Sequence, residues 1–176
     1  GIELRGKTLG IVGIGRIGQA TAKMALGLGM KVIAADSFIP QVDVKVEFFD
    51  GQSITTTIVS QSLESLFKEA DFITLHVPAQ DGYIVNEATL AMMKDGVGIV
   101  NCARGGVIDE VALIKALDSG KVSLAGLDVF ESEPKPEMTI LMHPKISLTP
   151  HIGAATGEAQ DRIGTELASQ IISILS

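Results

Sequence analysis

The chain has 176 residues, 46% of them hydrophobic, which is enough to close one sizeable core and short for two. Its net charge of −7, from 21 acidic and 14 basic residues, comes without any Lys- or Arg-rich run, which excludes a surface built to bind nucleic acid or an anionic membrane. We therefore expect one domain that acts on a small molecule.

The single cysteine, Cys102, excludes an internal disulfide and a cysteine-rich zinc site, and it favours a cytoplasmic protein. No apolar stretch approaches the roughly 18 residues of a membrane helix, and the first ten residues do not resemble a signal peptide. Because the chain begins at Gly1 and reaches a core-type strand almost at once, we expect an excised domain.

Short runs rich in Val, Ile and Leu recur along the chain and alternate with helical patterns. In chain order the predicted strands are "LGIVG", "KVIAAD", "DFITLHVP", "GVGIVNCA", "SLAGLDV" and "KISLTPH". Such near-continuous apolar strands separated by helices are typical of a parallel sheet covered on both faces. The prediction is an α/β protein with a three-layer, doubly wound parallel sheet.

Four helices are predicted between and after these strands. They cover residues 17–28, the segment behind the cap Ser62, the segment from Asp109 towards Gly120, and the segment from about Thr156 onwards. The last helix carries Ile163, Leu167, Ile171 and Ile174 at spacings of three and four, which predicts an amphipathic helix. Residues 38–60 break the rhythm by alternating apolar and polar residues around Asp50-Gly51, which predicts an excursion with extended or hairpin character.

A glycine-rich loop follows the first strand and opens the first helix. Gly13, Gly15 and Gly18 form a GxGxxG pattern in which the first glycine permits a tight turn, the second lets a pyrophosphate approach, and the third allows close packing of helix on strand. Asp36 ends the second strand, where it can accept hydrogen bonds from a ribose and repel a 2′-phosphate. These features predict a Rossmann NAD(P)-binding fold that prefers NAD to NADP, with a plain turn and a solvated acid as the alternatives.

Three further side chains follow strands at the same edge of the predicted sheet. Arg104 offers a planar fork for a substrate carboxylate, His151 can exchange a proton near neutral pH, and Glu133 can orient the histidine ring. Together they suit hydride transfer between a nicotinamide and a 2-hydroxy acid. Each could instead be a surface or loop residue.

Other polar residues are weaker candidates. His76 ends a strand and could border the adenine or be an ordinary strand-end residue, and His143 is expected in a surface loop. Cys102 is expected to be a small buried side chain near the cofactor, with a reactive thiol as the alternative. Glu131 and Glu133 form an acid pair, but no His or Cys joins them at ligand spacing, so no metal site is predicted.

These motifs resemble those of the NAD-dependent D-isomer-specific 2-hydroxyacid dehydrogenases. "LRGKTLGIVGIGRIG" is similar to the glycine loop of that family with the segment before it, "NCARGGVIDE" to its arginine motif, "GLDVFESEP" to its acid motif and "TPHIGAAT" to its histidine motif. Four motifs occur in the expected order through nearly the whole chain. Within the family, the resemblance is greatest to members that oxidise D-3-phosphoglycerate.

The resemblance implies roles for individual residues. Arg104, Glu133 and His151 would be catalytic, Arg16 and Ile17 would lie along the pyrophosphate, and Asp128 would approach the nicotinamide amide. The implied NAD-binding set is Gly13, Gly15, Arg16, Ile17, Gly18, Asp36, His76, Val77, Pro78, Cys102, Ala103, Arg104, Asp128, His151, Gly153 and Ala154.

The resemblance also implies an organisation and an activity. Family members carry a second, substrate-binding domain, so residues 1–176 are expected to be the NAD-binding domain alone, inactive or weakly active, and to form a homodimer. The implied reaction is oxidation of 3-phosphoglycerate to 3-phosphohydroxypyruvate in serine biosynthesis. Three alternative functions stay open. They are reduction of glyoxylate or hydroxypyruvate, a non-catalytic NAD-responsive scaffold like the co-repressors that share these motifs, and a bare nucleotide-binding module.

Overall fold

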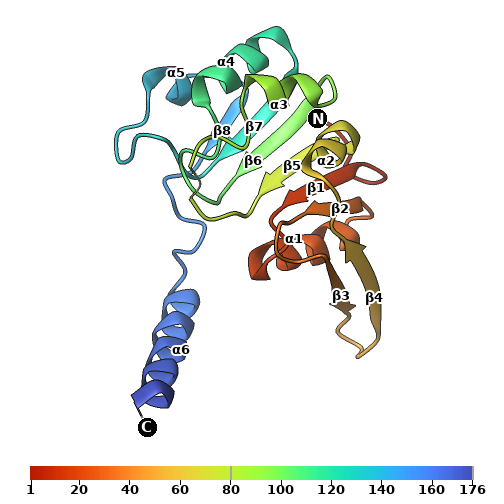
Figure 1. The fold of residues 1–176 in the computed structure, drawn as a ribbon, viewed down its shortest axis with the longest axis vertical. Helices are drawn as coiled ribbons and strands as arrows, with labels where there is room; N and C mark the ends of the chain where they lie inside the picture. Colours follow the sequence, from red (N-terminus) through yellow and green to blue (C-terminus); the bar gives the residue numbers. More distant parts are fainter. Residues whose placement is uncertain (80, 176) are drawn as a thin grey trace.

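The computed structural model describes residues 1–79 and 81–175, built around a six-stranded parallel sheet (Figure 1). The spatial order of the strands is β2-β1-β5-β6-β7-β8. Their bounds are β1 Thr8–Val12, β2 Lys31–Ala35, β5 Phe72–Leu75, β6 Val97–Asn101, β7 Val122–Leu127 and β8 Ile146–Leu148. All six runs that the sequence predicts as strands are confirmed.

The helices are α1 Arg16–Gly27, α2 Leu63–Glu69, α3 Glu87–Met92, α4 Glu110–Ser119, α5 Met138–Leu141 and α6 Gly157–Leu175. The predicted caps are confirmed: Ser62 accepts from the Ser65 N–H at 3.1 Å, Asp109 accepts from the Ala112 N–H at 2.9 Å, and Gly120 ends α4 in the left-handed region with φ 80°. Sequence reasoning missed α3 and α5, because neither is long enough to display helical periodicity.

Two apolar cores lie on opposite faces of the sheet. On one face α1 packs on β1 and β2, with Ile11, Ile14 and Ala22 buried between them. On the other face α2, α3 and α4 cover the sheet over a larger core that includes Phe67 and Leu113. This three-layer arrangement confirms the predicted doubly wound Rossmann fold.

Residues 38–60 form the predicted hairpin. Strands β3 Gln41–Glu47 and β4 Ser53–Val59 pair antiparallel, and Gly51 takes φ 85° in the turn between them. Val44 and Ile58 are buried in the core that α1 forms, so the hairpin base extends this layer beyond β2.

Helix α6 stands away from the sheet, at the bottom of Figure 1. The amphipathic helix is confirmed, but its apolar side is uncovered: the exposed fractions of Ile163, Leu167, Ile171 and Ile174 run from 48% to 81%. The ion pair between Arg16 and Glu166, 3.2 Å long and exposed, joins this helix to α1. No residue of the described part of α6 is buried.

Candidate active site

A cleft of about 640 Å³ opens at the carboxyl ends of β1, β2 and β5. The strand order reverses between β1 and β5, and ligands of open α/β sheets bind at such a switch point. Six predicted cofactor residues line this cleft: Gly13, Gly15, Asp36, His76, Val77 and Pro78. Sequence reasoning did not assign other lining residues to the cofactor, among them Ser37, Phe38, Gln61, Ser62 and Leu63, because only the fold brings them to the cleft.

The glycine loop is shaped by two close backbone contacts. Gly13 has φ 91°, and a Cβ there would overlap the carbonyl oxygen of His76. A Cβ on Gly18 would overlap the carbonyl oxygen of Gly13, so only glycine lets α1 pack this close to the loop. Gly15 precedes α1, and a Cβ there would meet open space.

This end of α1 suits an anionic group. The first amides of a helix have no partner within the helix, and Gly15 offers no side chain to cap them. The glycine loop therefore fits a dinucleotide pyrophosphate. Arg16 and Ile17, predicted beside the pyrophosphate, are both exposed, and the Arg16 guanidinium pairs with Glu166.

Asp36 joins the glycine loop to the end of β2. Its Oδ2 accepts from the Ile14 N–H at 2.9 Å, and its Oδ1 accepts from the N–H groups of Phe38 and Ile39 at 2.8 and 3.0 Å. Partial burial acts to raise the pKa of this carboxyl, but the three N–H donors together outweigh it and hold the pKa below its ordinary value. A carboxylate has about four acceptor positions, so Asp36 keeps one for a ligand hydroxyl while it also shapes the turn.

His76 directly follows β5 and lines the same cleft. Its Nε2 lies 3.1 Å from the Thr74 hydroxyl, and burial lowers the pKa of the ring. A neutral imidazole facing the cleft suits contact with an adenine better than with a phosphate.

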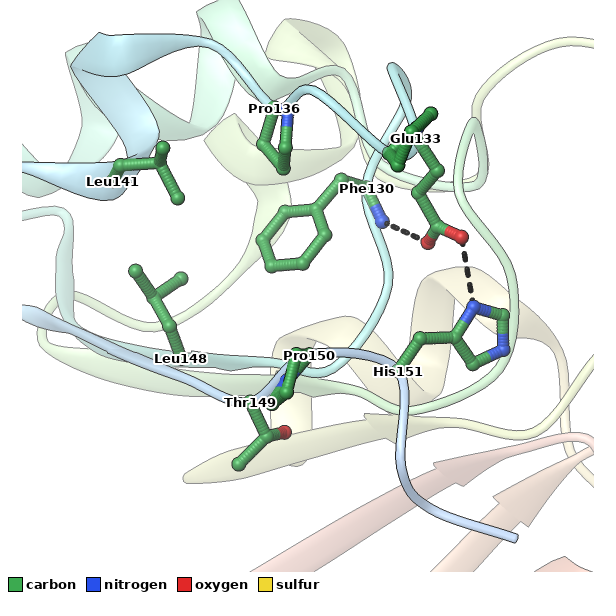
Figure 2. A pocket seen from close by; sticks show the side chains of 9 residues that line it. Phe130, Glu133, Pro136, Leu141, Leu148, Thr149, Pro150 and His151 are labelled. Atoms are coloured by element: carbon green, nitrogen blue, oxygen red, sulfur yellow. Dashed lines mark hydrogen bonds and ion pairs between the residues drawn. The ribbon is translucent and has the colours of Figure 1, made fainter. Parts of the chain in front are cut away.

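Glu133 and His151 meet beyond the ends of β7 and β8 (Figure 2). His151 Nδ1 lies 2.8 Å from Glu133 Oε2, and the Phe130 N–H donates to Glu133 Oε1 at 3.0 Å. The hydrogen bond with His151 and that from Phe130 hold the pKa of the Glu133 carboxyl below its ordinary value. The carboxylate therefore stays ionised at neutral pH and fixes the ring through Nδ1.

An apolar pocket of about 380 Å³ adjoins this pair. Phe130, Leu141, Leu148 and Pro150 supply most of its wall, and Glu133 and His151 form its polar edge, as Figure 2 shows.

Asp128 holds the loop that carries His151. The carboxylate is 3% exposed; Oδ1 accepts from the Thr149 hydroxyl at 2.6 Å and the Ile152 N–H at 2.8 Å, and Oδ2 accepts from the Gly153 N–H at 2.8 Å. His151 has φ 55°, an unfavourable conformation for a residue with a side chain. The bonds on either side of it keep His151 in this conformation. Three of the Asp128 acceptor positions thus serve the chain's own loop.

Arg104 lies on the neighbouring loop, after β6. Its guanidinium is exposed and its Nη1 donates to the Ala103 carbonyl at 2.6 Å. The Asn101 side chain donates to the Arg104 carbonyl at 3.0 Å, which fixes the backbone of this turn. The structure therefore joins Glu133 to His151 directly and places Arg104 at the same sheet edge without a direct bond to either.

The structure also places Cys102, His143, Ala103 and Ala154. Cys102 is exposed, so its predicted burial is wrong: it follows the last residue of β6, where the chain leaves the sheet. Desolvation and the charge of Asp128 raise the pKa of the thiol, which disfavours a reactive thiolate. His143 pairs with Asp118 at 3.3 Å. Ala103 is buried, whereas Ala154 is exposed.

Within residues 1–79 and 81–175, no group of three or more His, Cys, Asp or Glu side chains is arranged to hold a metal ion. The two acids noted as a pair in the sequence have different partners. Glu131 accepts from the Glu110 N–H, and Glu133 forms a hydrogen bond with His151. No helix within those residues is long and apolar enough to cross a membrane.

A comparison with known protein families identifies a model that covers most of the chain. The model of the D-isomer specific 2-hydroxyacid dehydrogenase, NAD binding domain, matches residues 1–153. A hydroxypyruvate reductase of Thermotoga maritima is 50% identical over 180 residues, which cover 99% of this chain and 55% of that protein. A D-3-phosphoglycerate dehydrogenase of Methanocaldococcus jannaschii is 46% identical over 177 residues, which cover 99% of this chain and 32% of that protein.

Solved structures agree with this match. A glyoxylate reductase from Paecilomyes thermophila superposes with a TM-score of 0.80 at 40% identity, over 94% of this chain and 48% of that one. The D-lactate dehydrogenase of Aquifex aeolicus, solved with NAD and lactic acid, gives a TM-score of 0.77 at 35% identity, over 99% of this chain and 55% of that one. The chain thus spans about half the length of these structures, and 55% and 32% of the two curated relatives.

Proposed function

This chain belongs to the D-isomer-specific 2-hydroxyacid dehydrogenases, as their NAD-binding domain, and we propose that it is the cofactor domain of a D-3-phosphoglycerate dehydrogenase. The proposed reaction is NAD-dependent oxidation of D-3-phosphoglycerate to 3-phosphohydroxypyruvate, a step of serine biosynthesis. The hydrogen bond between Glu133 and His151 carries the proposal of a dehydrogenase, since it builds a proton acceptor at the sheet edge where the cofactor cleft opens.

NAD supplies a hydride acceptor when bound, and the chain's own residues do the rest. The cleft fits it, with the open helix end at Gly15, the free acceptor position of Asp36 and the neutral ring of His76. We assign the proton transfer to His151: Glu133 holds Nδ1, so Nε2 faces outwards to take the proton of the substrate hydroxyl as the hydride departs. Arg104 binds the substrate carboxylate through its exposed guanidinium.

We further propose that residues 1–176 are one domain of a longer enzyme whose substrate domain lies outside this sequence. The greater length of the relatives supports this, and so do apolar surfaces that the described chain leaves open. Leu124 on β7 is exposed on the sheet face opposite the α4 core, and α6 exposes one whole side. On this proposal the chain alone binds NADH but turns over slowly, because the substrate cleft is open to water.

The homodimer and the cytoplasmic location also stay proposals. Ile17 and Met24 on α1 and Leu28 directly after it are exposed, and a second copy would cover these side chains. Sedimentation velocity tests this: we expect a dimer, and Met24→Glu should shift it towards monomer.

The alternative functions of glyoxylate reductase and hydroxypyruvate reductase differ from the proposal in substrate rather than in reaction type, and the 50% identity to the hydroxypyruvate reductase of Thermotoga maritima favours the second. The deciding experiment assays the full-length enzyme with D-3-phosphoglycerate and NAD, and with hydroxypyruvate or glyoxylate and NADH. A larger kcat/KM for oxidation of D-3-phosphoglycerate than for reduction of hydroxypyruvate or glyoxylate supports the proposal. The opposite ranking assigns the chain to a reductase.

A further inference from the structure

We propose that Glu110 and Glu131 form a reciprocal clamp that positions Glu133 against His151. The inference rests on the proposed function, since it concerns how the proton-transfer pair of that reaction is held. Glu110 is the first residue of α4, and Glu131 lies in the loop between β7 and α5.

The clamp consists of two hydrogen bonds in opposite directions. The Glu110 N–H donates to Glu131 Oε1 at 3.0 Å, and the Glu131 N–H donates to Glu110 Oε1 at 2.9 Å. Each carboxylate therefore accepts from the backbone of the other residue, 21 positions away in the sequence. The first amides of a helix are open donors and the helix dipole favours a carboxylate there, so the start of α4 is a natural anchor.

The loop needs such an anchor because Glu133 lies outside the sheet. Strand β7 ends at Leu127, and the next helix, α5, begins at Met138. The ladder of the sheet cannot determine where a side chain in this segment points. The clamp fixes the backbone two residues before Glu133, and the adjacent Phe130 N–H bonds directly to Glu133 Oε1 at 3.0 Å.

The same contacts tie this loop to the one that carries Arg104. A Cβ on Gly105 would overlap the carbonyl oxygen of Phe130, so the two backbones are in direct contact there. The segment that starts at Arg104 then continues into α4 and Glu110. Gly105 and the clamp are thus two attachments between the same pair of loops. Together they set the position of Arg104 relative to Glu133 and His151.

Burial and mutual repulsion make it costly to place two carboxylates here, so their presence points to a role in holding the loop. Glu110 is 8% exposed; burial raises the pKa of its carboxyl, the Glu131 N–H lowers it, and the charges of Glu131 and Glu137 raise it again. Glu131 is exposed and also shares a hydrogen bond with the Tyr83 phenol, whose pKa its charge raises. A hydrophobic residue would avoid these costs, but it could not hold the loop.

Alanine and glutamine variants separate positioning from charge. Glu131→Ala removes the acceptor of the Glu110 N–H, and Glu110→Ala removes the acceptor of the Glu131 N–H. Glutamine at either position keeps an acceptor oxygen without the charge. In the full-length enzyme we expect either alanine variant to lower kcat about 10- to 100-fold with the KM for NAD unchanged, since a shift of about 1 Å suffices for such a loss. Each glutamine variant should restore most of kcat.

A readout without turnover tests the clamp in the chain itself. The pKa of the Glu133 carboxyl, followed by ¹³C NMR, lies below its ordinary value because His151 and Phe130 bond to it. In Glu131→Ala it should rise towards the ordinary value of a glutamate, while in Glu131→Gln it should stay low. Glu137→Ala is the matched control, an exposed acid on the same segment whose loss should move neither readout. Because Glu131 is exposed, this variant keeps the core even if Glu110→Ala fails to fold.

The outcomes separate the two proposals. An unchanged Glu133 pKa and unchanged kcat in Glu131→Ala would overturn the clamp. A full-length enzyme that oxidises no 2-hydroxy acid would overturn the proposed function, while the Glu133 titration would still decide the clamp.

Discussion

Replacing Asp36 by asparagine should narrow the preference for NADH over NADPH. Asparagine can keep the two bonds from Phe38 and Ile39 on its single oxygen, but its amide then faces the Ile14 N–H, and a donor opposes a donor. Losing a charged acceptor for the ribose costs about 1.5–3 kcal/mol of NADH affinity. That corresponds to about 10- to 100-fold in Kd.

NADPH should respond differently to the same change. The 2′-phosphate would sit beside the Asp36 carboxylate, and two charges about 4 Å apart repel by about 1–4 kcal/mol between bulk water and a protein surface. Asparagine removes this repulsion, so NADPH affinity should hold or rise while NADH affinity falls.

Calorimetric titration of the chain with NADH and with NADPH measures both effects. Asp50→Asn is the matched control, because Asp50 also accepts a backbone N–H in a turn, from Gln52 at 3.0 Å, but lies in the hairpin outside the cleft. It should leave both affinities as they are. An unchanged ratio of NADH to NADPH affinity in Asp36→Asn would refute the ribose assignment.

Three further predictions concern catalysis, packing and pH. In the full-length enzyme, His151→Ala should lower kcat at least about 100-fold while NADH binding, measured by fluorescence, stays intact. If NADH binding were lost instead, His151 would belong to the cofactor site alone. Gly18→Ala should lower the free energy of unfolding by about 1–3 kcal/mol in urea denaturation, because its Cβ would overlap the Gly13 carbonyl. The control Gly27→Ala in the same helix meets open space and should raise the free energy of unfolding by about 0.5–1 kcal/mol. Equal effects of the two variants would contradict the close packing at Gly18. Glu110→Gln should stabilise the chain at pH 7 and lose that advantage as the pH falls through the raised folded pKa of this acid. Only the ionised carboxylate costs stability, and below the unfolded pKa the folded and unfolded states are both protonated. Denaturation at pH 7 and pH 4 checks this, and a pH-independent difference would be evidence against a buried charge.

Much of the fold could be predicted because it depends on local patterns. Ser62, Asp109 and Gly120 begin or end helices through their own side chain or backbone, and the apolar runs fill a sheet buried on both faces. The sequence also placed Glu133 and His151 at one edge of the sheet, because parallel strands end there, and the structure joins them. These predictions depend on residues close in sequence or on a general property of parallel sheets.

Other features could not be read from local patterns. Cys102 looks like a small core residue, yet it follows a strand end where the chain turns outwards. Asp36 looks like a pure ribose ligand, yet three N–H groups approach it once the turn forms. The periodicity of α6 predicted an apolar side correctly, but what that side faces depends on the placement of the helix.

The amino-acid sequence by itself determined most element types, the glycine loop and the candidate site residues, because these follow from side-chain size, backbone freedom and hydrophobic period. The tertiary structure alone decided which acceptors are already in use. Asp128 is committed to the Ile152 and Gly153 N–H groups, and Glu110 and Glu131 bond each other's backbone across 21 residues. A hydrogen bond forms only when a donor and an acceptor come within about 3 Å, and for residues far apart in sequence the packed fold sets that distance.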